Sequence, residues 1–263
     1  MCLILLSYRN HPSYRLILAA NRDEFYDRPT APLGFWDEAP HVLAGRDLKS
    51  GGTWLGITKA GRICAITNFR DPAVQLTDAP SRGLLVANYL KGSESPQIYL
   101  QKVKEAGERY NGFNLLAGDE SGIFYCSNRT DKIVRLSPGI HGLSNNLLDT
   151  PWPKVAKGKR CLEKILSSSE IDCESLFELL SDRNMPPDSD LPDTGVGIEW
   201  ERLLSPLFIR SEIYGTRSSS IVLIGKENIT FMERTYTIDG TGSMKHETRE
   251  FTLPNDFLQS RHF

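Results

Sequence analysis

Long hydrophobic runs are missing from this 263-residue sequence. No apolar stretch approaches the roughly 20 residues that a membrane-spanning helix needs. The apolar segment at the amino end is too short for a secretory signal and lacks its basic flank. We therefore expect a soluble, cytoplasmic protein without a transmembrane segment.

Cysteine and net charge are also low. The chain has 31 basic and 33 acidic residues and a net charge of −2, so it lacks the basic excess of nucleic-acid-binding proteins. The cysteines are odd in number, scattered and free of C-x-x-C spacing, which argues against a disulfide framework or a zinc site. They are Cys2, Cys64, Cys126, Cys161 and Cys173. We expect no nucleic-acid partner and no metal.

The predicted elements come as clusters of strands separated by pairs of helices, which is typical of an α+β fold rather than of alternating βα units. The predicted strands are 2–7, 14–20, 53–58, 62–69, 112–118, 122–128, 132–137, 219–224, 229–236 and 247–252. The predicted helices are 82–91, 96–109, one that begins at a Thr150–Pro151 cap, and 173–182 with Asp172 as its cap. Residues 23–52 are expected to be mostly loop. We interpret residues 1–263 as one domain.

Residues 184–200 form a long segment rich in proline, aspartate and glycine. Segments of this length without regular structure are uncommon unless they are lids, binding loops or disordered. Two readings stay open: a lid over a site, or a surface insertion.

The chain begins "MCLILL", which places Cys2 at the head of an apolar strand. Cys2 is either a small core residue or a nucleophile that is freed when the initiator methionine is removed. If the first hairpin turns at Asn10 and His11, Cys2 faces Ala19 or Ala20 across the strand pair.

The next four residues are all polar or charged: Asn21, Arg22, Asp23 and Glu24. Side chains alternate along a strand, so Arg22 and Glu24 share one face while Asn21 and Asp23 share the other. The pattern does not settle which pair lies beside Cys2. An arginine lowers the pKa of a nearby thiol, and a carboxylate can hold a terminal amine that acts as general base.

Six blocks of the chain, in order, resemble the NRDE family, which is also called the transport and Golgi organisation protein 2 family. They are AANRDEFYDRP (19–29), AGRDLKSGGTWLGI (44–57), ICAITNFRDP (63–72), YNGFNLLAG (110–118), GLSNNLLDTPWPKV (142–155) and YGTRSSSIVL (214–223). That family is distantly similar to N-terminal nucleophile (Ntn) hydrolases of the choloylglycine hydrolase and penicillin acylase type. The resemblance implies an αββα sandwich, with two stacked antiparallel sheets between outer layers of helices.

The resemblance also implies roles for single residues. Cys2 matches the catalytic nucleophile, and Asn68 matches an asparagine of the oxyanion hole. Asn145 matches a second asparagine near the active site, and Arg217 matches a late arginine that polarises it.

Arg22 and Asp23 match an early Arg–Asp pair of the hydrolases only loosely. The hydrolases space that pair as R-x-x-D, whereas here the two residues are adjacent. Glu24 is the alternative to Asp23. We add Asn21, Glu24 and the Trp54 of GGTWLG as candidate substrate-binding residues.

Two functions follow from the resemblance. The first is a Cys2-dependent hydrolase or acyltransferase that acts on amides or thioesters with a small apolar acyl group and requires no cofactor. The second is a carrier that binds haem as cargo, or handles lipid or acyl-coenzyme A. In the carrier, Arg22, Arg46 and Arg217 would pair with propionates. A eukaryotic member would be associated with mitochondria or the Golgi.

Overall fold

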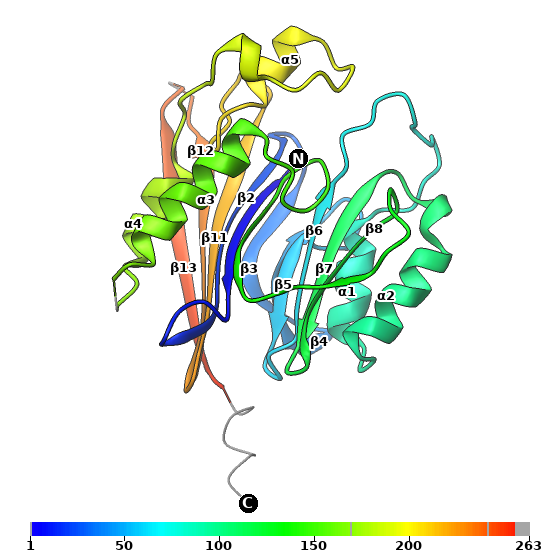
Figure 1. The fold of residues 1–263 in the computed structure, drawn as a ribbon, viewed down its shortest axis with the longest axis vertical. Coiled ribbons are helices and arrows are strands. Elements are labelled where there is room, and N and C mark those ends of the chain that lie inside the picture. The colour runs from blue at the N-terminus through cyan, green and yellow to red at the C-terminus, as the bar shows by residue number, and fades with distance from the viewer. Residues whose placement is uncertain (1, 169, 241, 256–263) are drawn as a thin grey trace, which may run out of the picture.

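The strands form two antiparallel sheets that lie face to face in the computed structural model, which describes residues 2–168, 170–240 and 242–255 (Figure 1). Sheet A has the order β10 (Gly139–Leu143), β1 (Cys2–Tyr8), β2 (Tyr14–Phe25), β11 (Tyr214–Gly225), β12 (Asn228–Ile238) and β13 (Met244–Pro254). Sheet B has the order β3 (Thr30–Trp36), β4 (Ala39–Asp47), β5 (Leu55–Thr58), β6 (Ile63–Asn68), β7 (Phe113–Asp119), β8 (Gly122–Ser127) and β9 (Val134–Arg135).

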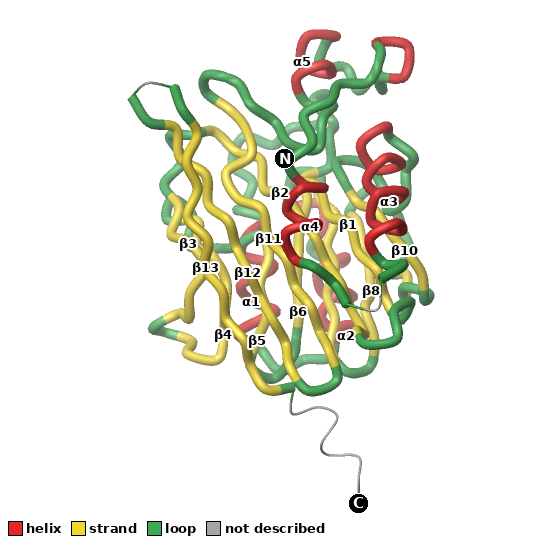
Figure 2. Tube along the Cα trace, turned by 90° about the vertical axis from the view of Figure 1, so that its left-hand side faces the viewer, coloured by secondary structure: helices red, strands yellow, loops and turns green. Residues whose placement is uncertain are grey.

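Helices cover the outer face of each sheet. Helices α1 (Gly83–Lys91) and α2 (Pro96–Glu105) pack on sheet B, and α3 (Pro153–Ile165) and α4 (Cys173–Leu180) pack on sheet A (Figures 1 and 2). The remaining helical segments are η1 (Gly107–Arg109), η2 (Asp188–Asp190) and α5 (Ile198–Leu203). The predicted α+β sandwich is therefore confirmed.

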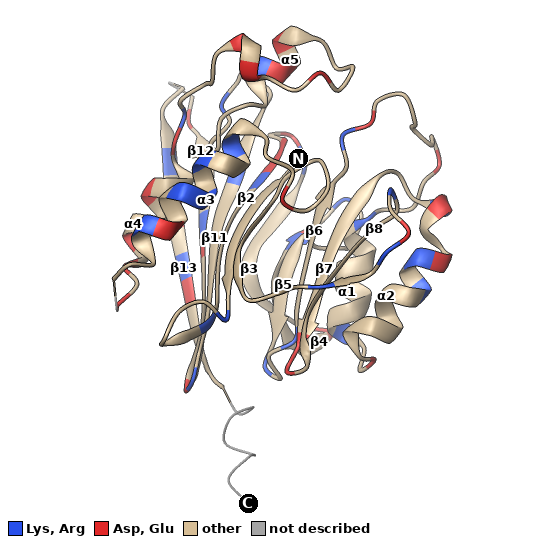
Figure 3. Ribbon diagram, in the orientation of Figure 1, with Lys and Arg blue, Asp and Glu red and all other residues tan. Residues whose placement is uncertain are grey.

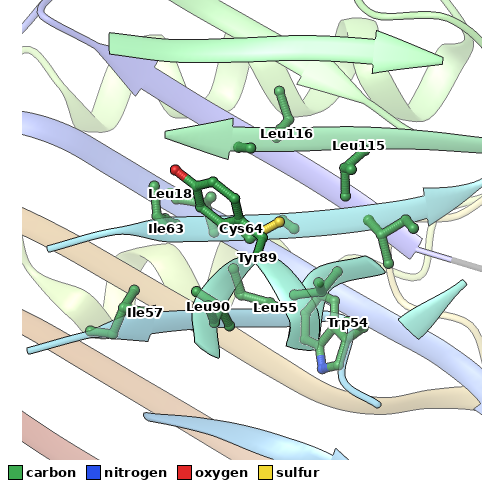
Figure 4. Packing of buried hydrophobic residues seen from close by; sticks show 14 of the residues in the cluster. Leu18, Trp54, Leu55, Ile57, Ile63, Cys64, Tyr89, Leu90, Leu115 and Leu116 are labelled. Carbon is green, nitrogen blue, oxygen red and sulfur yellow. The ribbon is translucent and has the colours of Figure 1, made fainter. Parts of the chain in front are cut away.

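Strand β1 is buried along its whole length, which explains why its sequence is continuously apolar rather than alternating. Ile4 and Leu6 belong to the core between the sheets, whereas Leu3 and Leu5 belong to the core beneath α3 and α4. On the outer face of sheet B, side chains of the strands pack against α1, as Figure 4 shows for Cys64. The scaffold thus buries both faces of the strand that carries Cys2.

Three sequence-based expectations need correction. Residues 23–52 are not mostly loop, because they contain the end of β2 and all of β3 and β4. Strand β3 lies at the edge of sheet B and its pairing is broken by register shifts, the position in which a sheet tolerates proline.

Helix α3 begins at Pro153 rather than at Thr150, and β10 was not predicted. The predicted cap of α4 is confirmed, since the Asp172 carboxylate accepts from two backbone N–H groups.

Candidate functional site

Cys2 is the first residue of β1 and pairs with Arg22 of β2. The expected pairing with Ala19 or Ala20 is wrong, because the hairpin does not turn at Asn10 and His11. The pairing is centred on Pro12, with Tyr8 opposite Leu16, so every partner on β2 lies further along the chain.

The observed register settles which side chains lie beside the thiol. Residues directly opposite each other on antiparallel strands point to the same face, so Cys2 and Arg22 share the face between the sheets. Glu24 follows on that face, with 4.0 Å between Arg22 Nη2 and Glu24 Oε2. Arg22 also donates from Nη1 to Thr30 Oγ1 at 3.2 Å.

Asn21 lies on the opposite face of sheet A, against the helical layer. Its Nδ2 donates to the backbone carbonyls of Leu180 and Leu207 at 2.9 and 2.8 Å. The side chain is fully buried and does not line the cavity described below. Asn21 therefore connects the strand to its covering helices.

Asp23 lies near the end of β2, lines the cavity and also contacts groups on the neighbouring strands β1 and β11. Its backbone N–H donates to the Cys2 thiol, and its Oδ1 accepts from Thr216 Oγ1 at 2.7 Å. Burial raises the pKa of the Asp23 carboxyl, and the nearby Lys154 ammonium partly offsets that rise. Burial also lowers the pKa of Lys154 to about 8.

Cys2 is buried, with 7% of the residue exposed. Burial raises its pKa, and the Arg22 guanidinium acts in the opposite direction. The thiolate is the reactive form of cysteine. Chemistry at Cys2 therefore requires a group that accepts the thiol proton.

A cavity of about 540 Å³ opens in front of Cys2, between the two sheets. Trp54 and Asn68 line it, as do the strand-end residues already described. Seven further charged residues line the cavity: Arg28, Arg46, Asp47, Lys49, Arg82, Arg217 and Glu233. Its volume lies within the range of small-molecule sites, but its wall is more charged than is usual for an apolar ligand.

Asn68 and Asn145 have different positions. Asn68 ends β6 and lines the cavity together with Cys2. Asn145 is fully buried, and its Nδ2 donates to the Asn68 carbonyl at 3.0 Å. The neighbouring Ser144 Oγ donates to the Cys2 carbonyl at 3.3 Å. Asn145 and Ser144 thus position the backbones of the two cavity residues.

Arg217 lines the cavity but also supports the chain around it. Its Nη1 lies 2.8, 2.9 and 3.2 Å from the carbonyl oxygens of Phe25, Tyr26 and Arg28. The guanidinium therefore closes the turn that follows β2 and adds a positive charge beside Arg22.

Sequence reasoning missed Arg82, the residue before α1. Its Nη1 donates to the Gly112 carbonyl at 2.8 Å, and its guanidinium lies within electrostatic range of Cys2. The glycines of GGTW place it there: a Cβ on Gly52 would lie 2.4 Å from the backbone of Gly83. This backbone-to-backbone contact, rather than contact with a ligand, explains why glycine is needed at Gly52.

A buried polar network joins the two sheets next to the site. Thr67 Oγ1 donates to the Ser144 carbonyl at 2.6 Å, and Asn114 Nδ2 donates to Thr67 Oγ1 and to the Asn146 carbonyl. Tyr125 donates its hydroxyl to Asn114 Oδ1 at 2.8 Å. The chain after β10 is therefore held by residues from three strands of sheet B.

The segment 184–205 packs over the end of sheet A near the amino terminus (Figure 1). Its Glu201 forms a buried ion pair with Arg70 at 2.5 Å, and Lys154 Nζ donates to the Leu204 carbonyl at 2.9 Å. Residues of this segment do not line the Cys2 cavity. The segment covers the Asp23–Lys154 side of the site instead.

Acidic and basic side chains are interspersed over the helices (Figure 3). Within the described ranges, no three His, Cys, Asp or Glu side chains converge as metal ligands would. None of the helices described here is long and apolar enough to cross a membrane.

Comparison with known sequences gives a match over most of the chain. The family model described as "Transport and Golgi organisation 2" matches residues 1–238. The Transport and Golgi organization 2 homolog of Mus musculus is 37% identical over 275 residues, covering 96% of this chain and 99% of the relative. The corresponding Homo sapiens protein is 38% identical over 276 residues with the same coverage. The Drosophila melanogaster protein is 32% identical over 268 residues, covering 90% of this chain and 93% of the relative.

Comparison with solved structures identifies the fold. A mutant of the conjugated bile acid hydrolase from Clostridium perfringens superposes with a TM-score of 0.52 at 10% identity, covering 97% of this chain and 98% of the other. The fold is therefore Ntn-hydrolase-like, as the resemblance predicted.

Proposed function

The chain belongs to the transport and Golgi organisation 2 family, and we propose that it is a Cys2-dependent hydrolase or acyltransferase that acts on amides or thioesters. One observation carries this proposal. The Cys2 thiol stands at the amino end of an inner strand and faces a cavity of about 540 Å³, in a fold shared with a protein named as a conjugated bile acid hydrolase.

In the proposed reaction, the Cys2 sulfur attacks the carbonyl carbon of the substrate. The new S–C bond forms as the C–N or C–S bond to the leaving group breaks, and the leaving amine or thiol takes the proton that the thiol has lost. Water, or an acceptor nucleophile, then releases the acyl group. The α-amine of a processed Cys2 would carry the proton between these steps, with the Asp23 carboxylate next to it.

The side chain of Asn68 is the candidate donor to the oxyanion, because it lines the cavity together with Cys2. One such donor contributes about 3–4 kcal/mol of transition-state stabilisation. Arg22, opposite Cys2 on β2, favours the thiolate. Asn145 acts by holding the Asn68 backbone.

The proposal is tested first by the intact mass of the protein purified from its native host. We expect a mass lacking one methionine, because the proposed base exists only after Met1, which lies outside the described residues, has been removed. The processed protein is then mixed with a panel of acyl anilides and acyl thioesters and quenched in acid. A single acyl adduct on the Cys2 peptide is expected, whereas a fully retained Met1 would contradict this mechanism.

A second candidate function is haem carriage, because Cys2, Arg22, Arg46 and Arg217 all line the same cavity. A thiolate is an established axial ligand of haem iron, and guanidinium groups pair with propionates. Arg46 already forms an ion pair with Glu38, so haem would have to compete for it. If the protein is a carrier, titration with haem at micromolar protein gives a saturable change in Soret absorbance. A purely linear response would contradict this function.

A further inference from the structure

The cavity wall carries cations that have no carboxylate partner. Arg28 pairs with Asp47, and Arg46 pairs with Glu38. In contrast, Arg82 and Arg217 line the same cavity and have no carboxylate oxygen within 4.0 Å among residues 2–168, 170–240 and 242–255; they donate to backbone carbonyls instead. Lys49 is exposed at the edge of the cavity, and its ammonium likewise has no carboxylate oxygen within 4.0 Å in the part of the chain that the structure describes.

The balance of charge in the cavity is positive although the chain as a whole is negative. Six cationic side chains reach the cavity: Arg22, Arg28, Arg46, Lys49, Arg82 and Arg217. Four carboxylates reach it: Asp23, Glu24, Asp47 and Glu233. Two of these four, Asp23 and Glu233, are buried. The chain carries a net charge of −2, so this excess is local.

The two unpaired guanidiniums come from different sheets. Arg82 lies in the connection between β6 of sheet B and α1, and Arg217 lies on β11 of sheet A. Repulsion by Arg22 adds to burial in lowering the pKa of Arg217. An anion placed between these groups would relieve that repulsion. The amino end of α1, which borders the cavity at Gly83 and has no acidic residue in its first turn, adds further positive potential.

We propose that Arg82 and Arg217, with Lys49 at the entrance, form an anion-binding subsite of the Cys2 cavity, which selects substrates that carry a carboxylate or a phosphate group. The selection of substrates rests on the proposed function of Cys2, but the anion site itself does not. The subsite differs from the apolar acyl pocket that the family resemblance led us to expect.

The subsite can be measured without any substrate by alkylating Cys2 with two reagents of similar size. Iodoacetate is an anion and iodoacetamide is neutral, and both react with the thiolate. The ratio of their rates at Cys2 therefore reports the local potential, while any change in thiol pKa cancels. Rates are followed by mass spectrometry of the Cys2 peptide and are compared with those of N-acetylcysteine amide.

We expect the iodoacetate-to-iodoacetamide ratio at Cys2 to exceed that of the free thiol and to fall as salt is added. Arg82→Gln lowers the ratio about two- to sixfold, as expected when a charge that interacts with Cys2 across a partly solvated cavity is removed. The Arg82→Lys variant keeps the charge, so its rate ratio should stay close to that of the wild type. Lys226→Gln makes the same change of net charge on an exposed turn away from the cavity and leaves the ratio unchanged.

Protection of Cys2 then distinguishes the two anions. If inorganic phosphate slows alkylation at a lower concentration than succinate does, the subsite selects a phosphate group. If succinate protects at the lower concentration, the subsite selects a carboxylate. A ratio at Cys2 equal to that of the free thiol, and insensitive to Arg82→Gln, would overturn the subsite. Because this result does not depend on turnover, it is independent of whether the acyl-enzyme forms.

Discussion

The Cys2→Ala variant is expected to lose turnover of amides and thioesters by about 10³- to 10⁶-fold, the range seen when a catalytic nucleophile is removed. The thiol supplies the only atom in the proposed reaction that bonds to the substrate, so no neighbour can replace it. The free energy of unfolding should change little, by about 1 kcal/mol, because the change removes one atom that borders a cavity. Steady-state kinetics and urea denaturation of the same preparation measure both quantities.

Cys64→Ala is the matched control. Cys64 is fully buried in β6 and does not line the cavity, so the same chemical change there removes a packed sulfur. This variant should keep the turnover number and lose stability. Equal turnover by the Cys2→Ala variant and the wild type would show that the thiol is not the nucleophile.

The Glu201→Gln variant is expected to show the largest loss of stability, about 3–5 kcal/mol. The side chains of Arg70 and Glu201 are only 5% and 3% exposed, so the change leaves a buried guanidinium without its counter-charge. The glutamine amide also turns N–H donors toward the N–H donors of Arg70. Thr194, which donates to the other carboxylate oxygen, holds the acceptor in place and limits rearrangement. The measurements are the urea midpoint and the rate of proteolysis within 184–205.

The same segment offers an exposed ion pair as control. Arg202 and Asp188 are 43% and 53% exposed, and pairs of that kind contribute about 0–1 kcal/mol. Asp188→Asn should therefore leave the urea midpoint nearly unchanged. If Glu201→Gln were as mild as Asp188→Asn, the buried pair would not be what holds the segment to sheet A.

Local patterns predicted the first hairpin but not its register. The apolar runs show where β1 and β2 lie, whereas the partner of Cys2 depends on where the turn between them is centred. A pairing centred on Pro12 gives Arg22, whereas one centred nearer Asn10 and His11 gives Ala19 or Ala20. The choice between the two faces of β2 was open for the same reason.

Residues whose position depends on contacts distant in sequence could not be predicted. Arg82 reaches the cavity because Gly52 and Gly83 bring two backbones together, and no local pattern carries that contact. Asn145 was identified from the resemblance, but its position behind Asn68 depends on where β10 ends. Strand β3 was not predicted because it contains Pro32, which an edge strand accommodates.

The order of strands in the two sheets has a consequence for biosynthesis. Sheet B is built from one continuous stretch, residues 30–135, so it can assemble while the rest of the chain is still being translated. Sheet A cannot, because β2 pairs with β11, and the bond between Asn21 and Ser219 spans 198 residues. Closing so long a loop is entropically costly and slows folding. We therefore expect the pairing of β2 with β11 to be among the last to form, so that the hairpin that carries Cys2 is completed into sheet A only after β11 has been translated.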